Sequence, residues 1–181
     1  MQQKLLLGSR KFNLVIQRLC HQLIETHDDF RESAIIGLQP RGIYLADRIH
    51  QELKKILPKS EIPCGHLDIT FFRDDFRRRD TPLVANATDI DFIIENKKVI
   101  LVDDVLYTGR TIRSGLDAMM AFGRAARVEL LVLVDRRYFR HLPIEPDYIG
   151  IQVDSIASQS VKVTWKETEQ EDAIYLINTS H

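Results

Sequence analysis

The hydrophobic residues of this chain fall into two alternating kinds of segment. Short apolar runs predict buried strands; they cover residues 33–38, 65–72, 98–104, 127–135 and 148–153. Longer stretches with apolar residues three or four positions apart predict amphipathic helices; they cover residues 10–27, 43–57 and 110–123. Ser9 is the expected cap of the first helix, Pro58 follows the second, and Gly123 is the expected stop of the third.

This order of elements predicts an α/β fold: a mostly parallel sheet flanked by helices on both faces, in a single domain of residues 1–181. Two further apolar runs, 161–165 and 173–177, predict a small C-terminal strand region. Residues 73–98 lack a firm period, and the stretch RDDFRRRDTP is almost entirely charged. We expect a long loop or hairpin there, and long loops in compact domains are usually functional or disordered.

Composition narrows the class of protein. The chain of 181 residues is 44% hydrophobic and 28% charged, which is ordinary for one soluble domain. Its net charge of −1 gives no overall attraction to nucleic acid or a membrane surface, so an RNA-binding role would need a local basic patch. Cys20 and Cys64 belong to no metal-binding pattern, and no apolar run approaches a membrane span. We expect a cytoplasmic protein without membrane contact.

The stretch VILVDDVLYTGRT, residues 99–111, carries the chemistry. A buried strand ends at Asp103 and Asp104, and in parallel sheets ligands bind beyond this end of the strands. The following loop, 106–111, leads into a helix N-terminus, where free backbone N–H groups and the helix dipole favour an anion. Gly109 allows close approach of a ligand, and the flanking threonines add hydroxyl donors. The loop is therefore suited to a phosphate.

Carboxylates repel a phosphate, so the two aspartates need a different role beside it. They can accept hydrogen bonds from sugar hydroxyls or hold a hydroxyl-bound Mg²⁺. A sugar phosphate satisfies both halves of the motif, with its 5′-phosphate in the loop and its ribose on Asp103 and Asp104. The alternative is a turn in which Asp or Thr only caps the helix. The combination of apolar run, paired acids and TGRT favours the binding site.

The same stretch resembles the phosphoribosyl pyrophosphate (PRPP) signature of type I phosphoribosyltransferases. In particular, DDVLYTGRT is similar to the PyrR family of bifunctional pyrimidine operon attenuators and uracil phosphoribosyltransferases. The resemblance covers nearly the whole chain in family order. Its further segments are PRGIYLA (40–46), LDITFFRDD (67–75), VLVDR (132–136), LPIEPDYIG (142–150) and SQSVKV (158–163).

The resemblance implies a set of site residues. Those implied to bind PRPP or UMP are Pro40, Arg41, Arg73, Arg79, Asp103, Asp104, Val105, Leu106, Tyr107, Thr108, Gly109, Arg110, Thr111, Arg136 and Val161. Arg41 is expected on the pyrophosphate, in a loop where the family commonly has Thr in place of Pro40. Arg73 and Arg79 are expected on a flexible flap loop that closes over PRPP and excludes water. Arg136 and Val161 are expected beside the base.

The implied reaction is uracil plus PRPP giving UMP and pyrophosphate. Asp103 and Asp104 are the implied catalytic residues, and they are also expected to hold Mg²⁺ through the ribose or through water. Mg²⁺ and Arg41 would stabilise the leaving pyrophosphate. The resemblance also implies a homo-oligomer, a dimer or larger.

The implied second role is UMP-dependent binding of the pyr leader mRNA. The RNA-binding residues that we expect are Arg18, His21, Arg137 and Arg140. A basic cluster of this kind would bind the phosphate backbone in a salt-dependent manner. Two positions depart from the family: Glu145 stands where Bacillus-like members carry a basic residue, and Gln17 replaces a small hydroxyl residue. A carboxylate at position 145 would repel RNA phosphates.

Three functions therefore stay open at the level of sequence. The first is a uracil phosphoribosyltransferase, with or without attenuation. The second is a nucleotide-sensing RNA-binding attenuator whose enzyme activity is vestigial. The third is a phosphoribosyltransferase for a purine base, which would share the sugar site but not the base pocket. Formation of UMP, tested beside purine bases, separates them.

Overall fold

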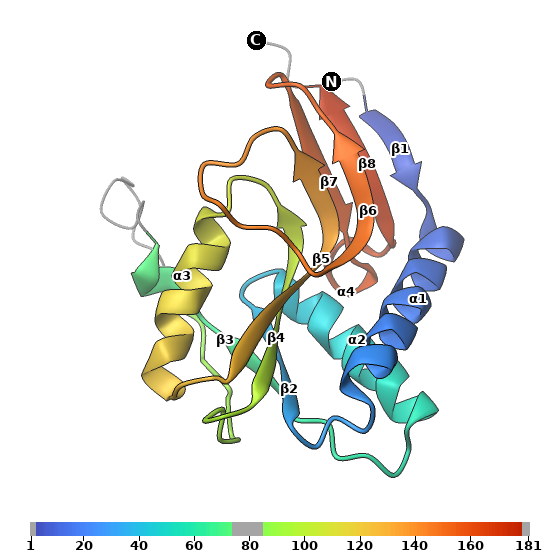
Figure 1. The fold of residues 1–181 in the computed structure, drawn as a ribbon. Coiled ribbons are helices and arrows are strands. Elements are labelled where there is room, and N and C mark those ends of the chain that lie inside the picture. The colour runs from blue at the N-terminus through green and yellow to red at the C-terminus, as the bar shows by residue number, and fades with distance from the viewer. Residues whose placement is uncertain (1–2, 74–84, 179–181) are drawn as a thin grey trace.

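The computed structural model describes residues 3–73 and 85–178. Figure 1 shows the elements in their arrangement. In chain order they are β1 (Gln3–Leu7), α1 (Ser9–His27), β2 (Ser33–Leu38), α2 (Gly42–Ile56), β3 (Cys64–Leu67), η1 (Thr70–Phe72), β4 (Lys98–Leu106), α3 (Arg110–Met119), η3 (Met120–Phe122), β5 (Arg127–Arg137), β6 (Tyr148–Asp154), β7 (Gln159–Thr164), α4 (Lys166–Glu169) and β8 (Ala173–Asn178). No helix in this described part is long and apolar enough to cross a membrane.

The main sheet has five strands in the order β3-β2-β4-β5-β6. All four pairings are parallel, which confirms the predicted parallel sheet. All six residues of β2 are buried, as expected for a continuous apolar strand covered on both faces. β4 is the central strand, so β2 and β5 both lie beside its carboxyl end.

Helices cover both faces of this sheet, with α1 and α2 on one side and α3 on the other (Figure 1). Successive side chains of β4 alternate between the two layers. Ile100 and Val102 pack in the cluster that contains α1 and α2, whereas Val99 and Leu101 pack in the cluster that contains α3. The fold class predicted from the sequence is therefore correct.

The predicted C-terminal strand region is a separate antiparallel sheet in the order β1-β8-β7. Its edge strand β1 was not predicted, because the N-terminal leucines gave no strand pattern. β1 depends on a partner at the other end of the chain, where Lys4 pairs with Leu176. Trp165, fully buried, joins this sheet to the helices by an edge-on contact with Phe12, whose ring centroid lies 5.2 Å away.

The predicted strand 65–72 ends earlier, at Leu67. Asp68 stops it, because its Oδ1 accepts hydrogen bonds from the backbone N–H of Thr70, at 3.1 Å, and from the Thr70 hydroxyl, at 2.6 Å. An aspartate turn of this kind competes with strand pairing. The segment 70–72 is a 3₁₀ turn instead.

Two helix ends also differ from expectation. The N-cap of α1 is Gly8, and Ser9 is already helical. The Ser9 hydroxyl donates to the carbonyl of Asp172 at 3.0 Å, so it ties the helix to the second sheet. The α-helical part of 110–123 ends at Met119 and continues as the 3₁₀ turn η3, after which Gly123 adopts φ +137°.

A buried polar cluster lies where α1 ends against the main sheet. His27 Nε2 is 3.0 Å from Glu129 Oε2, and the Tyr148 hydroxyl donates to the same oxygen at 2.7 Å. Ser33 Oγ lies 2.9 Å from His27 Nδ1. Burial lowers the pKa of His27 from its ordinary value of 6.5, although the Glu129 carboxylate opposes this shift.

We expect this cluster to make folding stability depend on pH. Because the folded pKa of His27 lies below 6.5, the unfolded chain takes up the proton first. Stability is thus fully present above about 6.5 and falls as the pH is lowered through that value. Urea unfolding at several pH values checks this, and His27→Gln should show a weaker acid loss. His21→Gln, on the exposed face of the same helix, should retain the full loss; an equal change in both variants contradicts the assignment.

Candidate active site at the carboxyl end of the parallel sheet

β4 places Asp103 and Asp104 at the centre of the carboxyl edge. Asp103 is only 6% exposed, and its Oδ1 accepts a hydrogen bond from the backbone N–H of Asp104 at 2.9 Å. The Asp104 carboxylate meets the guanidinium of Arg41 from the β2–α2 loop, with Nε to Oδ2 at 3.1 Å. The structure thus brings together the two acids and one of the cations that the sequence predicted.

The ionised forms of the two carboxyls are disfavoured by their surroundings. Burial raises the pKa of Asp103 well above its ordinary value, and the neighbouring Asp104 raises it further. Burial also raises the pKa of Asp104, and Arg41 opposes that shift. Because desolvated negative charge is costly, both groups gain from a ligand that supplies hydroxyl donors or a cation.

The phosphate loop follows directly. Gly109 is the N-cap of α3 with φ +88°, a left-handed conformation that favours glycine. As a glycine, this N-cap residue has no side chain that could cap the first backbone N–H groups of the helix. The hydroxyl of Thr108 accepts from the backbone N–H of Arg110 at a long 3.4 Å. The loop geometry therefore agrees with the anion site that the sequence predicted.

Arg140 holds the phosphate loop in place through hydrogen bonds to its backbone. Its guanidinium donates to the carbonyls of Leu106 and Tyr107 and forms an ion pair with Asp135. In addition, the backbone N–H of His141 donates to the carbonyl of Thr108 at 3.0 Å. We predicted Arg140 as an RNA-binding residue; the contacts make it a support of the phosphate loop, which sequence reasoning missed. Nothing in the local sequence pattern indicates such contacts, because they reach back more than 30 positions.

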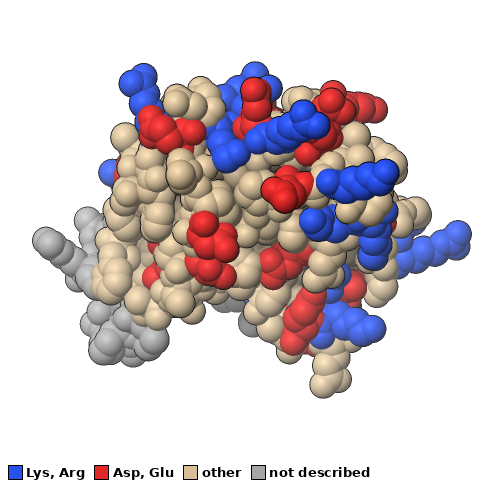
Figure 2. Space-filling model, turned by 90° about the horizontal axis from the view of Figure 1, so that it is seen from below, with Lys and Arg blue, Asp and Glu red and all other residues tan. Residues whose placement is uncertain are grey.

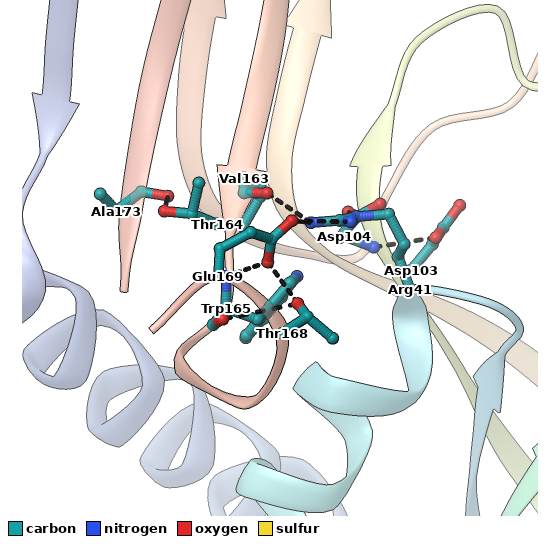
Figure 3. Close-up of polar contacts among 9 residues, drawn as sticks. All are labelled: Arg41, Asp103, Asp104, Val163, Thr164, Trp165, Thr168, Glu169 and Ala173. Carbon is teal, nitrogen blue, oxygen red and sulfur yellow. Dashed lines mark hydrogen bonds and ion pairs between the residues drawn. The ribbon is translucent and has the colours of Figure 1, made fainter. Parts of the chain in front are cut away.

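Arg41 is held from a second direction as well. Besides Asp104, its guanidinium donates to Glu169 Oε1, with Nη1 at 3.2 Å, and to the carbonyl of Val163 (Figure 3). Glu169 lies at the end of α4 and was not among the predicted residues. Pro40, the residue before Arg41, follows a cis peptide bond.

Arg136 lies at the carboxyl end of β5 and is 6% exposed. Its guanidinium carbon lies 3.8 Å from the centroid of the Tyr107 ring, and burial lowers its pKa. The guanidinium also donates to the Ser155 hydroxyl at 3.1 Å and to the carbonyl of Gln159 at 2.9 Å. It thereby joins the phosphate loop to β7, the strand that carries Val161. The predicted base pocket residues hence lie on adjoining elements.

The predicted flap is reached only at its start. The positive charge of Arg73 opposes the effect of burial on the pKa of Asp103. Arg79 and the rest of the predicted flap segment up to residue 84 lie outside the described residues. Their role stays a prediction.

The remaining RNA-binding candidates are engaged with the protein. Arg18 donates to the carbonyls of Ile149 and Gly150 at 3.1 and 2.5 Å. Arg137 forms a two-pronged ion pair with Asp154, at 2.6 and 2.8 Å. His21 is exposed on α1. On the face that holds the amino ends of the parallel strands, acidic and basic side chains are interspersed (Figure 2), so its described residues form no single-sign patch.

The acids are suited to Mg²⁺ that is shared with a substrate. Among the described residues no group of three or more His, Cys, Asp or Glu could enclose a metal. Mg²⁺ commonly binds through one or two carboxylates and completes its shell with water and substrate oxygens. The desolvated pair Asp103 and Asp104 fits that pattern, because a cation would relieve the burial of both charges.

Comparisons with known proteins agree with this geometry. The model of the phosphoribosyl transferase domain family matches residues 2–168. The "Bifunctional protein PyrR" of Desulfosudis oleivorans is 44% identical over 173 residues, covering 96% of this chain and 94% of that one. The protein of the same name from Bacillus subtilis is 40% identical over 176 residues, covering 96% of each.

Solved structures confirm the fold alone. A hypoxanthine phosphoribosyltransferase from Staphylococcus aureus aligns with a TM-score of 0.70 at 17% identity, covering 97% of this chain and 92% of that one. A hypoxanthine phosphoribosyltransferase from Trypanosoma cruzi gives 0.71 at 15% identity, covering 97% and 91%. The near-complete match to the domain family and to PyrR proteins shows that the chain belongs to the PyrR family of type I phosphoribosyltransferases.

Proposed function

We propose that the chain transfers a phosphoribosyl group from PRPP to uracil, giving UMP and pyrophosphate. The observation that carries the proposal is the pair of buried Asp103 and partly buried Asp104 directly before a phosphate loop at the N-terminus of α3. The PyrR relatives at 40–44% identity favour uracil over the purine alternative, since the hypoxanthine enzymes share only 15–17% identity.

Different residues of the site would bind different parts of PRPP. The 5′-phosphate would bind the backbone N–H groups of the loop 108–111, and the ribose hydroxyls would donate to Asp103 and Asp104. The ring nitrogen of uracil bonds to C1 of the ribose while the bond from C1 to the pyrophosphate oxygen breaks, and the proton of that nitrogen passes to water or to the departing pyrophosphate. The aspartates favour the positive charge that develops on the sugar, and Arg41 lies where it can stabilise the departing pyrophosphate.

Mg²⁺ fits this proposal as the cofactor. When bound, it would neutralise negative charge on the pyrophosphate as that group leaves. Asp103 and Asp104 would hold it through ribose hydroxyls or through water, in keeping with their desolvated carboxylates.

The test is UMP formation from PRPP, Mg²⁺ and uracil, with hypoxanthine and guanine in parallel. The proposal predicts product with uracil alone. Product with a purine base and none with uracil would favour the purine alternative. No product from any base would leave the nucleotide-sensing attenuator as the better explanation.

We also propose a second activity, UMP-dependent binding of pyr leader mRNA, as the bifunctional relatives suggest. The exposed Glu145 lines a cavity of about 410 Å³ together with Arg137 and Arg140. Its charge adds to those of Asp154 and Asp135, which already pair with Arg137 and Arg140, at the surface where RNA phosphates are expected.

Replacement of this carboxylate should therefore strengthen RNA binding. We expect Glu145→Arg to lower the Kd for a pyr leader RNA by about tenfold at low salt, and to steepen its salt dependence. An electrophoretic mobility shift at several salt concentrations, with UMP present, measures both. Glu167→Arg on the α4 turn serves as the charge-matched control, and equal affinity of the two variants would contradict a role for position 145.

Three broader points belong to the proposal. The chain forms a single domain. This part of the proposal is supported by the core cluster in which Trp165 and Ile174 of the C-terminal region pack with α1 and α2. It acts in the cytoplasm, in keeping with the free cysteines Cys20 and Cys64. It forms a homo-oligomer, which light scattering of the purified protein would test.

A further inference from the structure

The guanidinium of Arg41 is already surrounded by protein acceptors. With residues in the described part of the chain it makes four hydrogen bonds: one to Asp104, two to Glu169 and one to the carbonyl of Val163 (Figure 3). A guanidinium has five N–H donors in all. Two carboxylates therefore flank one positive charge, and few donors of Arg41 are available to an incoming anion.

Glu169 is fixed in this position by its own turn. Its Oε2 accepts a hydrogen bond from the backbone N–H of Trp165 at 3.0 Å and another from the Thr168 hydroxyl. These bonds leave Oε1 directed at Arg41, as the close-up shows (Figure 3). The turn itself is anchored, because the Trp165 side chain is fully buried in the core.

The charge state of Glu169 is also defined. The hydrogen bond from Thr168 lowers its pKa, and the backbone N–H of Trp165 and the Arg41 guanidinium lower it further against partial burial. The side chain is thus negatively charged at neutral pH. Since Asp104 is the ribose-binding acid of the proposed reaction, Glu169 is the acid around Arg41 that the reaction does not use.

Resting on the proposed function, we propose that Glu169 competes with the pyrophosphate group of PRPP for Arg41 and thereby sets the affinity of the site for PRPP. Pyrophosphate is the stronger ligand, because it offers several charged oxygens, and its binding exchanges the Arg41–Glu169 bonds for new ones. The negative charge of Glu169 weakens that exchange, both by holding the guanidinium and by repelling the anion. Glu169 is a positioning residue in this scheme, because it acts through Arg41.

Glu169→Gln tests the proposal, because glutamine keeps the size and one acceptor oxygen but removes the charge. The matched control is Glu167→Gln on the same short helix, since Glu167 pairs with Arg48, at 2.9 and 2.7 Å, and not with Arg41. Calorimetric titration with inorganic pyrophosphate and Mg²⁺ reads the site directly. Steady-state kinetics then separate KM for PRPP, KM for uracil and kcat.

We expect Glu169→Gln to lower the Kd for pyrophosphate and the KM for PRPP by about twofold to fivefold, the range of a partly exposed ion pair. The KM for uracil should not change, and kcat should stay within about twofold. Glu167→Gln should match the wild type in all four quantities, even where its melting temperature falls. This split distinguishes competition for Arg41 from a purely structural role of the α4 turn.

Unchanged or weaker pyrophosphate binding in Glu169→Gln overturns the proposal, and so does a wild type that binds no pyrophosphate. The titration needs no turnover, so its result is separate from the uracil assay. If uracil is not a substrate but the Kd for pyrophosphate still falls, the inference about Glu169 stands and the proposed function fails. If UMP forms while both variants bind alike, the proposed function stands and the inference fails.

Discussion

Asp103→Asn combined with Asp104→Asn should reduce UMP formation by at least about 10³-fold, because the ribose and Mg²⁺ lose their charged partners. The structure indicates that this loss comes from the reaction and not from unfolding. At the end of β4 Asp103 is buried and Asp104 is partly buried, and this burial raises the pKa of each, so their ionised forms cost stability at neutral pH. A carboxyl whose folded pKa is raised favours folding below its unfolded pKa and loses that benefit as the pH rises.

The double variant should therefore fold at least as well as the wild type at neutral pH. A melting temperature equal to or above that of the wild type, together with lost turnover, is the expected pair of results. Asp117→Asn is the control, since Asp117 is half exposed on α3, where it pairs with Arg113 across one helical turn, at 3.6 Å. Retained activity in the double variant would remove both acids from the site, and a collapsed fold would contradict the assignment of their charge as a cost.

The part of the site that could be predicted from the sequence is the part that is local. Asp103, Asp104 and Gly109 lie within seven positions, and the strand–loop–helix geometry follows from the apolar run before them and the helical pattern after them. The parallel sheet was predictable for the same reason. Its strands are continuous apolar runs that alternate with amphipathic helices, and each pattern depends only on nearby residues.

The contacts that hold the site in place could not be predicted. Glu169 reaches Arg41 across 128 positions, and Arg140 reaches the carbonyl of Tyr107 across 33. Neither contact is marked by a pattern in the sequence. The charged residues around Arg140 and Glu169 look the same as those of an ordinary solvent-exposed surface. The first pair depends on the fold that places α4, between β7 and β8, beside the carboxyl edge of the main sheet, and the second on the segment between β5 and β6 that returns to the loop after β4.

Local competition explains the misplaced strand end. The apolar residues of 65–72 continue past Leu67, but the Asp68 side chain captures the backbone of Thr70 and turns the chain. The pattern of apolar residues records burial, which is correct for Ile69 at 2% exposure and wrong for Phe71 at 65%. Beyond Leu67 a residue can thus be buried without belonging to a strand. This change lies close to the segment where the flap was expected.

Gly42→Ala should have the second large effect, on both stability and activity. A Cβ on Gly42 would lie 2.4 Å from the carbonyl oxygen of Val102 and 2.9 Å from the Cα of Asp103. These are backbone atoms of the central strand, so they cannot move aside as the end of a side chain would. The β2–α2 loop that carries Arg41 must shift away from the acids instead. We expect a loss of about 2–4 kcal/mol in the free energy of unfolding.

The same shift should lower kcat/KM for PRPP by about 10²-fold, because a displacement on the order of 1 Å in a positioned group can cost that much. Urea unfolding and steady-state kinetics at a temperature where the variant stays folded measure the two effects separately. Gly8→Ala is the matched control: its Cβ would lie 3.8 Å from Leu5 Cδ2 without a clash, so stability should fall by no more than about 1 kcal/mol, the cost of alanine in place of glycine at an N-cap. If Gly42→Ala keeps wild-type turnover, the close approach of this loop to Asp103 is not needed for catalysis, and Arg41 must act from a position that tolerates the shift.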